Sequence, residues 1–220
     1  MINTRILPQN HGNLYIVAAA SGTGKTSLVD ALIQQVDQLQ VSISHTTRKP
    51  RPGEENGKHY YFTDEAHFLD LIHKQAFLEH AKVFDHHYGT STQAVRDKLA
   101  EGIDLILEID WQGARQVHKV FPNATGIFIL PPSLDALRER LSERAQDDET
   151  VIERRMQSAI DEISHYKEFN YIVINDDFET ALAELSTIVL ANRNALQRQM
   201  AKHADLIKSL ISENPEDALE

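Results

Sequence analysis

The segment from Leu14 to Val36 constrains the fold of this 220-residue chain most, because it combines a strand, a loop of small residues and a helix. Leu14 to Val17 form a short apolar run of the kind found in buried strands. A strand that leads through a small-residue loop into a helix is typical of an α/β protein. From Thr26 onward, apolar residues recur at the spacing of one helix face: Leu28, Val29, Leu32, Ile33 and Val36.

The loop in this segment matches a phosphate-binding loop, or P-loop. The pattern G-x-x-x-x-G-K-[ST] fits residues 19–26 from Gly24 onward, with Ala19 at the first glycine position. A plain small-residue turn is the alternative, but the strand and helix around the loop favour a site where backbone N–H groups bind phosphate. Lys25 is predicted to reach the β- and γ-phosphates of a nucleoside triphosphate, and Thr26 to ligate Mg²⁺. The predicted triphosphate-binding residues are Ala19, Ala20, Ser21, Gly22, Thr23, Gly24, Lys25, Thr26 and Ser27.

The rest of the chain alternates strands and helices, which predicts a parallel sheet. We expect further strands at 104–110, 126–130 and 171–174 and helices at 92–101, 133–141, 151–166 and 180–200. Residues 41–95 differ, because short strands at 41–44, 60–62 and 83–84 surround one helix at 65–74. This part is predicted to be a small antiparallel lobe inserted in the sheet domain, and 138–156 a second separate piece.

Composition excludes several classes of protein. A length of 220 residues predicts one domain with lobes, and a net charge of −11 argues against binding to nucleic acid polymers or anionic membranes. The absence of cysteine excludes disulfides, thiolate metal sites and a catalytic thiol. No apolar run reaches the roughly 20 residues of a membrane span, and no signal peptide is visible, so a cytoplasmic location is expected. The eleven histidines show no zinc-binding spacing.

Two groups of polar residues extend the phosphate chemistry. Glu108 and Asp110 stand at the end of a strand, where one of them is expected to hold Mg²⁺ through water, unless they are ordinary strand-end acids. The bases Arg48, Lys49 and Arg51 lie beside a proline turn, and arginine forks match phosphate, although a solvated basic loop has the same composition. Tyr60 and Tyr88 are candidate hydroxyl donors, and Phe62 and Phe84 candidate core residues.

Several motifs together resemble the guanylate kinase family over residues 12–195. They are SHTTR-x-PR-x-GE at 44–54, G-x-x-Y at 57–60, FLE at 77–79, YGT at 88–90, IDWQG at 109–113 and NDD at 175–177. The resemblance implies a bacterial-type, single-domain kinase that transfers the γ-phosphoryl group of ATP to GMP in purine nucleotide metabolism and GMP recycling. It implies a P-loop NTPase core of α/β class with helices flanking a parallel sheet, a small α+β GMP-binding lobe and a helical lid. The expected boundaries are core 1–43, 96–137 and 157–200, lobe 44–95, lid 138–156 and C-terminal tail 201–220.

The resemblance also implies roles for individual residues. Arg48, Arg51, Tyr60 and Tyr88 would hold the GMP phosphate. Glu79 would accept hydrogen bonds from the guanine N1–H and 2-amino groups, and Ser44 and Thr90 would line the other base edge. Glu108 would contact GMP or Mg²⁺, and Thr26 and Asp110 (through water) would hold the metal. Lys25, Arg48 and the lid arginines Arg140, Arg144 and Arg155 would be catalytic, although six acids in the lid also fit a salt-bridged, solvated helix pair.

The chemistry of these residues is consistent with that reading. Adenine has an acceptor at N1 and no 2-amino group, so a buried Glu79 would be unpaired against AMP, and unmet polar groups give discrimination of roughly 10⁴. The attacking phosphate oxygen of GMP is already anionic, so positioning, charge neutralisation and exclusion of water suffice without a strong base. Two alternatives stay open: a P-loop kinase for another small acceptor, and a non-catalytic domain that binds a phosphopeptide. The C-terminal stretch is predicted to be a contact between copies, a docked helix or a frayed one.

Overall fold

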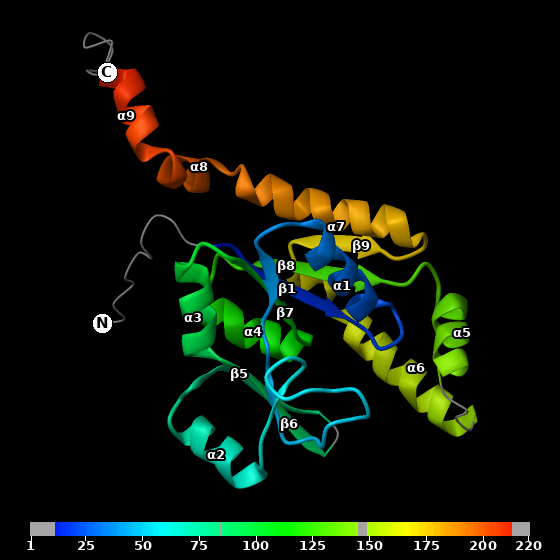
Figure 1. Ribbon diagram of the computed structural model, residues 1–220. Coiled ribbons are helices and arrows are strands. Elements are labelled where there is room, and N and C mark those ends of the chain that lie inside the picture. Colours follow the sequence, from blue (N-terminus) through cyan, green and yellow to red (C-terminus); the bar gives the residue numbers. More distant parts are fainter. Residues whose placement is uncertain (1–11, 84, 145–148, 213–220) are drawn as a thin grey trace.

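A five-stranded parallel sheet forms the core of the computed structural model, which describes residues 12–83, 85–144 and 149–212 (Figure 1). All four pairs of neighbouring strands run parallel. Helices cover both faces of the sheet (Figure 1). The predicted α/β class with a flanked parallel sheet is therefore confirmed. The order is β2 (Leu39–Val41), β7 (Asp104–Glu108), β1 (Leu14–Ala19), β8 (Thr125–Leu130) and β9 (Tyr171–Ile174).

Alternation along β1 divides the core between the two faces. Tyr15 and Val17 pack on one side with the apolar faces of the first and seventh helices. Leu14 and Ile16 pack on the other side with the third and fourth helices. Successive strand side chains point to opposite faces, so one apolar run builds both layers. These helices are α1 (Lys25–Gln35), α7 (Phe178–Arg193), α3 (Thr92–Ala100) and α4 (Trp111–Val120).

A second, four-stranded sheet forms the inserted lobe (Figure 1). Its order is β4 (Tyr61–Phe62), β3 (His45–Thr46), β6 (His86–Ser91) and β5 (Phe77–Val83), with α2 (Glu65–His73) beside it. The pairs β3–β6 and β5–β6 are antiparallel, but β3 and β4 pair parallel, so the prediction of a purely antiparallel lobe is wrong. The long loop between β3 and β4 makes this possible, because parallel neighbours need a crossover rather than a hairpin.

The residues expected to form the lid, 138–156, lie on two helices, α5 (Leu134–Arg144) and α6 (Glu149–Ser164), and the short helix η1 (Tyr166–Glu168) follows them. Leu137 and Leu141 of α5 pack with Ile152 and Met156 of α6 in a small apolar cluster. Ala20 of the P-loop belongs to the same cluster. The lid helices are therefore packed directly on the phosphate loop.

Several predicted elements differ from the observed ones. The strand expected at 41–44 is wrong, because β2 ends at Val41 where its pairing with β7 ends. Helix α4 was not predicted, although Asp110 caps it by accepting a hydrogen bond from the Gly113 N–H at 2.8 Å. The helix expected over 180–200 is interrupted at Asn194 and Ala195, after which α8 (Leu196–Lys202) begins. Phe84 lies outside the described residues.

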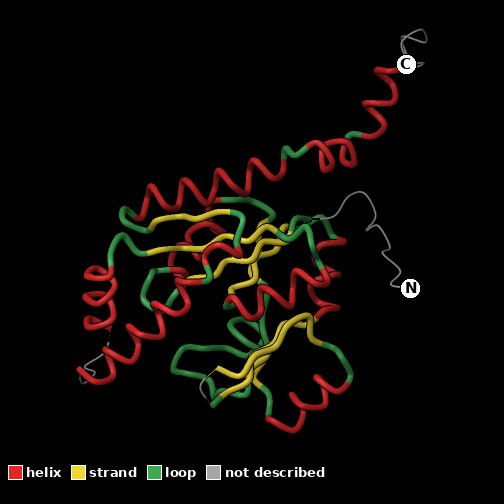
Figure 2. Tube along the Cα trace, turned by 180° about the vertical axis from the view of Figure 1, so that it is seen from behind, coloured by secondary structure: helices red, strands yellow, loops and turns green. Residues whose placement is uncertain are grey.

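The C-terminal part forms a further helix, α9 (Ala204–Ser212), which extends with α8 away from the body (Figure 2). Its apolar residues include Leu206, Leu210 and Ile211, and each of them is more than half exposed. The predicted contact between copies through this stretch stays a prediction. In the part of the chain that the structure describes, no helix has the length and apolar character of a membrane span.

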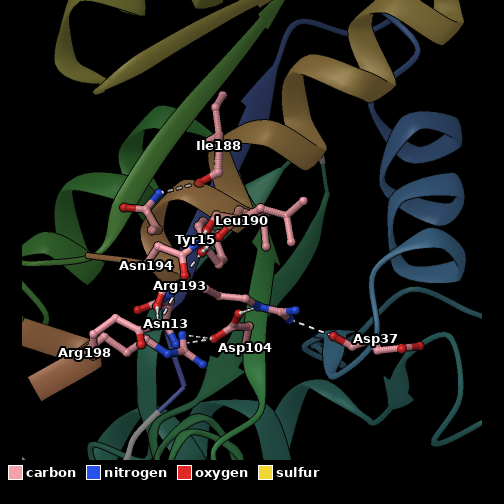
Figure 3. Close-up of polar contacts among 12 residues, drawn as sticks. Asn13, Tyr15, Asp37, Asp104, Ile188, Leu190, Arg193, Asn194 and Arg198 are labelled. Carbon is pink, nitrogen blue, oxygen red and sulfur yellow. Dashed lines mark hydrogen bonds and ion pairs between the residues drawn. The ribbon is translucent and has the colours of Figure 1, made fainter. Parts of the chain in front are cut away.

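A buried carboxylate joins α7 and α8 to the start of the sheet (Figure 3). Asp104 has no exposed side-chain surface and accepts hydrogen bonds from Asn13 N at 2.6 Å, Arg193 Nε at 2.7 Å and Arg198 Nη1 at 2.5 Å. Nearby, the Tyr15 hydroxyl donates to the Val189 carbonyl oxygen at 3.2 Å. This cluster lies at the edge where the parallel strands begin, opposite to the P-loop.

Candidate active site

The P-loop follows the carboxyl end of β1 and bends through two glycines with positive φ. Gly22 and Gly24 both have φ near +90°, a conformation that glycine adopts without steric cost. A Cβ atom at Gly24 would lie 2.5 Å from Asn175 Nδ2. Thr23 is buried, and its hydroxyl donates to the Ala20 carbonyl oxygen at 2.9 Å. Helix α1 begins at Lys25, so its free N–H groups face the loop, as the sequence predicted.

Glu108 lies beside Lys25 and Thr26 at the end of β7. Its Oε2 atom is 3.5 Å from Lys25 Nζ and 3.2 Å from Thr26 Oγ1, which donates to it. A hydroxyl and a carboxylate oxygen at one place are the hard ligands that Mg²⁺ prefers, so the residues fit this ion. Asp110 caps α4 through Oδ1, so the capping hydrogen bond does not use its Oδ2 atom. Among the described residues, no three His, Asp or Glu side chains gather into a metal-binding group.

Asn175 connects the P-loop to the lid, and sequence reasoning assigned it no role. It is buried at the end of β9, and its Nδ2 donates to the Thr23 carbonyl oxygen at 2.6 Å. Its own carbonyl oxygen accepts from Arg140 Nη2 at 3.0 Å. Among the described residues, the buried Arg140 Nη1 has no hydrogen-bond partner, which leaves a cationic donor available next to the phosphate loop. The NDD motif was the available signal, because it places an asparagine directly after a strand of the sheet that carries the P-loop.

Helix α6 reaches the P-loop with two side chains that are two turns apart. Arg155 Nη2 lies 3.4 Å from Ser21 Oγ. Glu162, which the sequence analysis did not select, receives a hydrogen bond from the Ser21 backbone. Burial and the charge of Asp110 raise the pKa of Glu162, although Ser21 and Lys25 act in the opposite direction. Arg138 pairs with Glu153, as expected for a solvated helix pair, whereas Arg155 lies at the P-loop. The side chain of Arg144 lies outside the described part.

Arg48 is held in place by Glu54, a residue whose partner could not be identified from the sequence. Two hydrogen bonds of 2.9 and 2.8 Å join Nη1 and Nη2 to the Glu54 carboxylate, which also accepts from Arg51 N at 2.7 Å. The Arg48 hydrogen bond lowers the pKa of Glu54 to about 2, with the Arg51 N–H adding to it. Nη1 of Arg48 also donates to Lys49 O. Its Nε–H and second Nη2–H, a side-on fork, are used by neither Glu54 nor Lys49.

The predicted hydroxyl donors gather around this guanidinium. Arg48 lies 5.3 Å from the centre of the Tyr60 ring, and the rings of Tyr60 and Tyr88 are 6.0 Å apart. Tyr88 also hydrogen-bonds Arg48. Burial raises the pKa of Tyr60, and the charges of Tyr88 and Glu108 contribute in the same direction. Arg51 is exposed.

Glu79 is a buried carboxyl group inside the lobe. Only 4% of its surface is exposed, and Oε1 accepts a hydrogen bond from the fully buried Thr90 hydroxyl at 2.6 Å. Ser44 Oγ lies 3.2 Å from Thr90 Oγ1, so these three predicted residues form one chain. Burial raises the pKa of Glu79 to about 7, and the charge of Asp110 adds to this effect against the Thr90 hydrogen bond.

Comparison with known proteins identifies similar sequences along almost the whole chain. A family model described as guanylate kinase matches residues 11–192. The guanylate kinase of Saccharophagus degradans is 57% identical over 91% of this chain and 98% of that protein. The guanylate kinases of Legionella pneumophila (strain Lens) and Escherichia coli (strain K12) are 53% and 51% identical, over 94% and 92% of this chain and 99% of each relative.

A solved structure has the same architecture. The crystal structure of guanylate kinase from Anaplasma phagocytophilum superposes with a TM-score of 0.71 at 31% identity. The match covers 86% of this chain and 90% of that one. The family match over residues 11–192 also spans both the P-loop core and the inserted lobe, rather than one shared motif.

Proposed function

This chain belongs to the guanylate kinase family, and we propose that the residues described above let it transfer the γ-phosphoryl group of ATP to GMP, giving ADP and GDP. It is an enzyme, a nucleoside monophosphate kinase of purine nucleotide metabolism that recycles GMP. The observation that carries the assignment of residues is the buried Glu79 carboxyl, linked to Thr90 and Ser44 in the lobe next to a P-loop that retains Lys25 and Thr26.

The lobe at 44–95 binds GMP in this proposal. Arg48, the exposed Arg51 and the hydroxyls of Tyr60 and Tyr88 bind its phosphate. Guanine presents N1–H and a 2-amino group to Glu79, whose Oε1 atom already accepts the Thr90 hydroxyl. Ser44 and Thr90 bind the other base edge. An adenine in this place would leave the carboxylate unpaired, so selectivity follows from burial.

The P-loop and the lid bind ATP. Residues Ala19 to Ser27 surround its phosphates with backbone N–H groups, and Lys25 neutralises the β- and γ-phosphates. Thr26 and Glu108 would hold Mg²⁺, with Asp110 contributing through water. When bound with ATP, this ion supplies positive charge to the phosphate oxygens. Cytoplasmic ATP and GMP pools fit a cytoplasmic location for the enzyme.

Transfer itself needs positioning and charge rather than a general base. A GMP phosphate oxygen held by Arg48 is already anionic and attacks the γ-phosphorus in line. Negative charge spread over the γ-phosphoryl oxygens is stabilised by Lys25 and by the lid residues 138–156, where Arg140 has an unpaired donor and Arg155 reaches Ser21. Arg144 belongs to the same proposal. The apolar packing of α5 and α6 on Ala20 excludes water that would otherwise accept the phosphoryl group.

A coupled assay with ATP, Mg²⁺ and each nucleoside monophosphate tests this proposal. GMP is expected to be phosphorylated, and Lys25→Met is expected to reduce turnover by about a thousandfold or more, because one charge on the transferring phosphates is lost. Glu79→Gln is expected to reduce kcat/KM for GMP more than ATP affinity, which calorimetry measures. Turnover with AMP, CMP or UMP but not GMP would contradict the assignment.

A further inference from the structure

Strand β5, which carries Glu79, is the edge strand of the small sheet, and its open edge is covered by a side chain from another part of the chain. On one side β5 pairs with β6, where Glu79 is opposite Thr90 and His80 is opposite Gly89. On the other side, His80 N–H donates to Gln116 Oε1 at 3.1 Å, and Gln116 Nε2 donates to His80 O at 2.9 Å. The amide of Gln116 thus takes the place of a neighbouring strand.

The same helix approaches the Glu79 carboxyl directly. Gly113 lies one turn before Gln116 in α4, and a Cβ atom there would be 3.0 Å from Glu79 Oε2. On the opposite side, Thr90 holds Oε1 at 2.6 Å. The carboxyl group is therefore enclosed between β6 and α4, and a shift of either element changes where its oxygens lie.

The hydrogen bond to His80 N–H acts on the peptide unit that joins Glu79 to His80. A peptide unit is planar, so fixing its N–H also fixes the Cα atom of Glu79. Two hydrogen bonds to one residue define an orientation as well as a distance, which a single bond would not do. Helix α4 follows β7, which ends at Glu108 beside the P-loop. Gln116 therefore connects the strand that carries Glu79 to a helix that starts near the P-loop.

We propose that Gln116 is a positioning residue for guanine recognition: its side-chain amide fixes the β5 backbone at His80 and thereby places the Glu79 carboxyl for the N1–H and 2-amino groups of GMP. This inference rests on the proposed function, because it assumes that Glu79 reads guanine. Gln116 itself touches no substrate in this account. If Gln116 only held α4 and β5 together, the hydrogen bonds would be the same, but its loss would not act selectively on KM for GMP.

The experiment compares Gln116→Leu with Gln112→Leu, an exposed glutamine one turn earlier in the same helix. Steady-state kinetics are measured with GMP, with IMP, which lacks the 2-amino group, and with varied ATP. For Gln116→Leu, KM for GMP is expected to rise roughly tenfold, the size of effect that one or two lost positioning hydrogen bonds give. The preference for GMP over IMP is expected to decrease with it, while KM for ATP stays within about twofold of the wild-type value.

The matched variant Gln112→Leu is expected to leave all three constants unchanged. Gln116→Asn, whose shorter amide does not reach His80, gives the same test if the leucine variant does not fold. Equal KM values for GMP in the two leucine variants, an unchanged preference for GMP over IMP, or parallel increases in KM for GMP and ATP would each overturn the role of Gln116. A wild-type enzyme that does not phosphorylate GMP would instead overturn the proposed function, which separates the two failures.

Discussion

At the scale of single residues, Lys25, Arg48 and Glu79 each have a carboxylate or hydroxyl partner. Motifs in the sequence predicted a role for all three. Glu54 and Asn175, which hold Arg48 and the P-loop, received no role because their contacts join loops that are distant in sequence or bent by the fold. The raised pKa of Glu79 likewise results from its burial and not from its residue type.

The raised pKa of Glu79 predicts a pH dependence of stability. Burial raises this pKa from 4.5 to about 7, so the folded protein retains a proton that the unfolded chain releases in this interval. Without ligand, the free energy of unfolding is therefore expected to fall as pH rises from 4.5 to 7, on the order of 3 kcal/mol. Below this interval both states are protonated, and above it the full cost is present.

Urea unfolding of wild type and Glu79→Gln between pH 4.5 and 8.5 measures this effect. The variant lacks the charge, so its stability relative to wild type is expected to increase with pH through the same window. GMP should reduce the difference for the wild type, because its N–H donors stabilise the ionised carboxylate. Parallel stability curves for the two proteins would show that Glu79 does not titrate in this way.

At the scale of elements, periodicity located long elements and failed where tertiary pairing sets the boundaries. The Val-Ser-Ile-Ser alternation at 41–44 is typical of a strand, but β2 takes Leu39 to Val41 because those residues pair with β7. Helix α4 has few apolar residues, so its helical periodicity was weak in the sequence. The start of the helix is defined by its capping residue, Asp110. The lid helices were predicted, but their packing against Ala20 of the P-loop was not.

The lid cluster gives an element-scale prediction. Leu141 is fully buried and lies close enough to Gly22 that a Cβ there would contact its side chain at 2.9 Å. Leu141→Ala is expected to destabilise the packing of α5 on α6 and the P-loop by about 2 to 4 kcal/mol, because it leaves a cavity. Hydrogen exchange in α5 and α6 should accelerate, and KM for ATP should rise.

Leu134→Ala on the same helix is the matched control, because Leu134 is 49% exposed. It should leave both exchange and KM for ATP unchanged within about twofold. If Leu141→Ala left exchange in the lid helices unchanged, the cluster would not be what holds them on the P-loop.

At the scale of the whole molecule, charge is distributed unevenly. The net charge of −11 seemed unfavourable for anionic substrates, yet the P-loop carries Lys25 and has Arg155 of the lid next to Ser21. The acids elsewhere include Asp104, whose contacts with Arg193 and Arg198 attach α7 and α8 to the start of β7 (Figure 3). Because parallel strands begin at one edge and end at the other, this cluster is separated from the P-loop by the length of the sheet.

Removal of the Asp104 carboxylate is expected to reduce stability without changing the chemistry. Asp104→Ala leaves two arginines and the Asn13 N–H without their acceptor, at a cost of about 3 kcal/mol. The arginines keep about a fifth of their side-chain surface exposed, which holds the loss near the lower end for a buried pair. Urea unfolding should show this loss, while kcat and both KM values stay near wild type at temperatures where the variant is folded. A large change in KM for ATP would instead connect this edge to the site.

The sequence by itself determined the class of fold and the family, and it predicted the phosphate loop and the candidate substrate-binding side chains. These depend on local properties: hydrophobic periodicity, the backbone freedom of Gly22 and Gly24, and the chemistry of residue types at fixed spacing. Only the tertiary structure decided that Glu79 is buried, that Glu54 holds Arg48, that Asn175 joins the P-loop to Arg140 and that Gln116 pairs with His80. Burial and directed hydrogen bonds depend on distances between segments far apart in the chain, and those distances exist only after the sheet and the lobe have packed together.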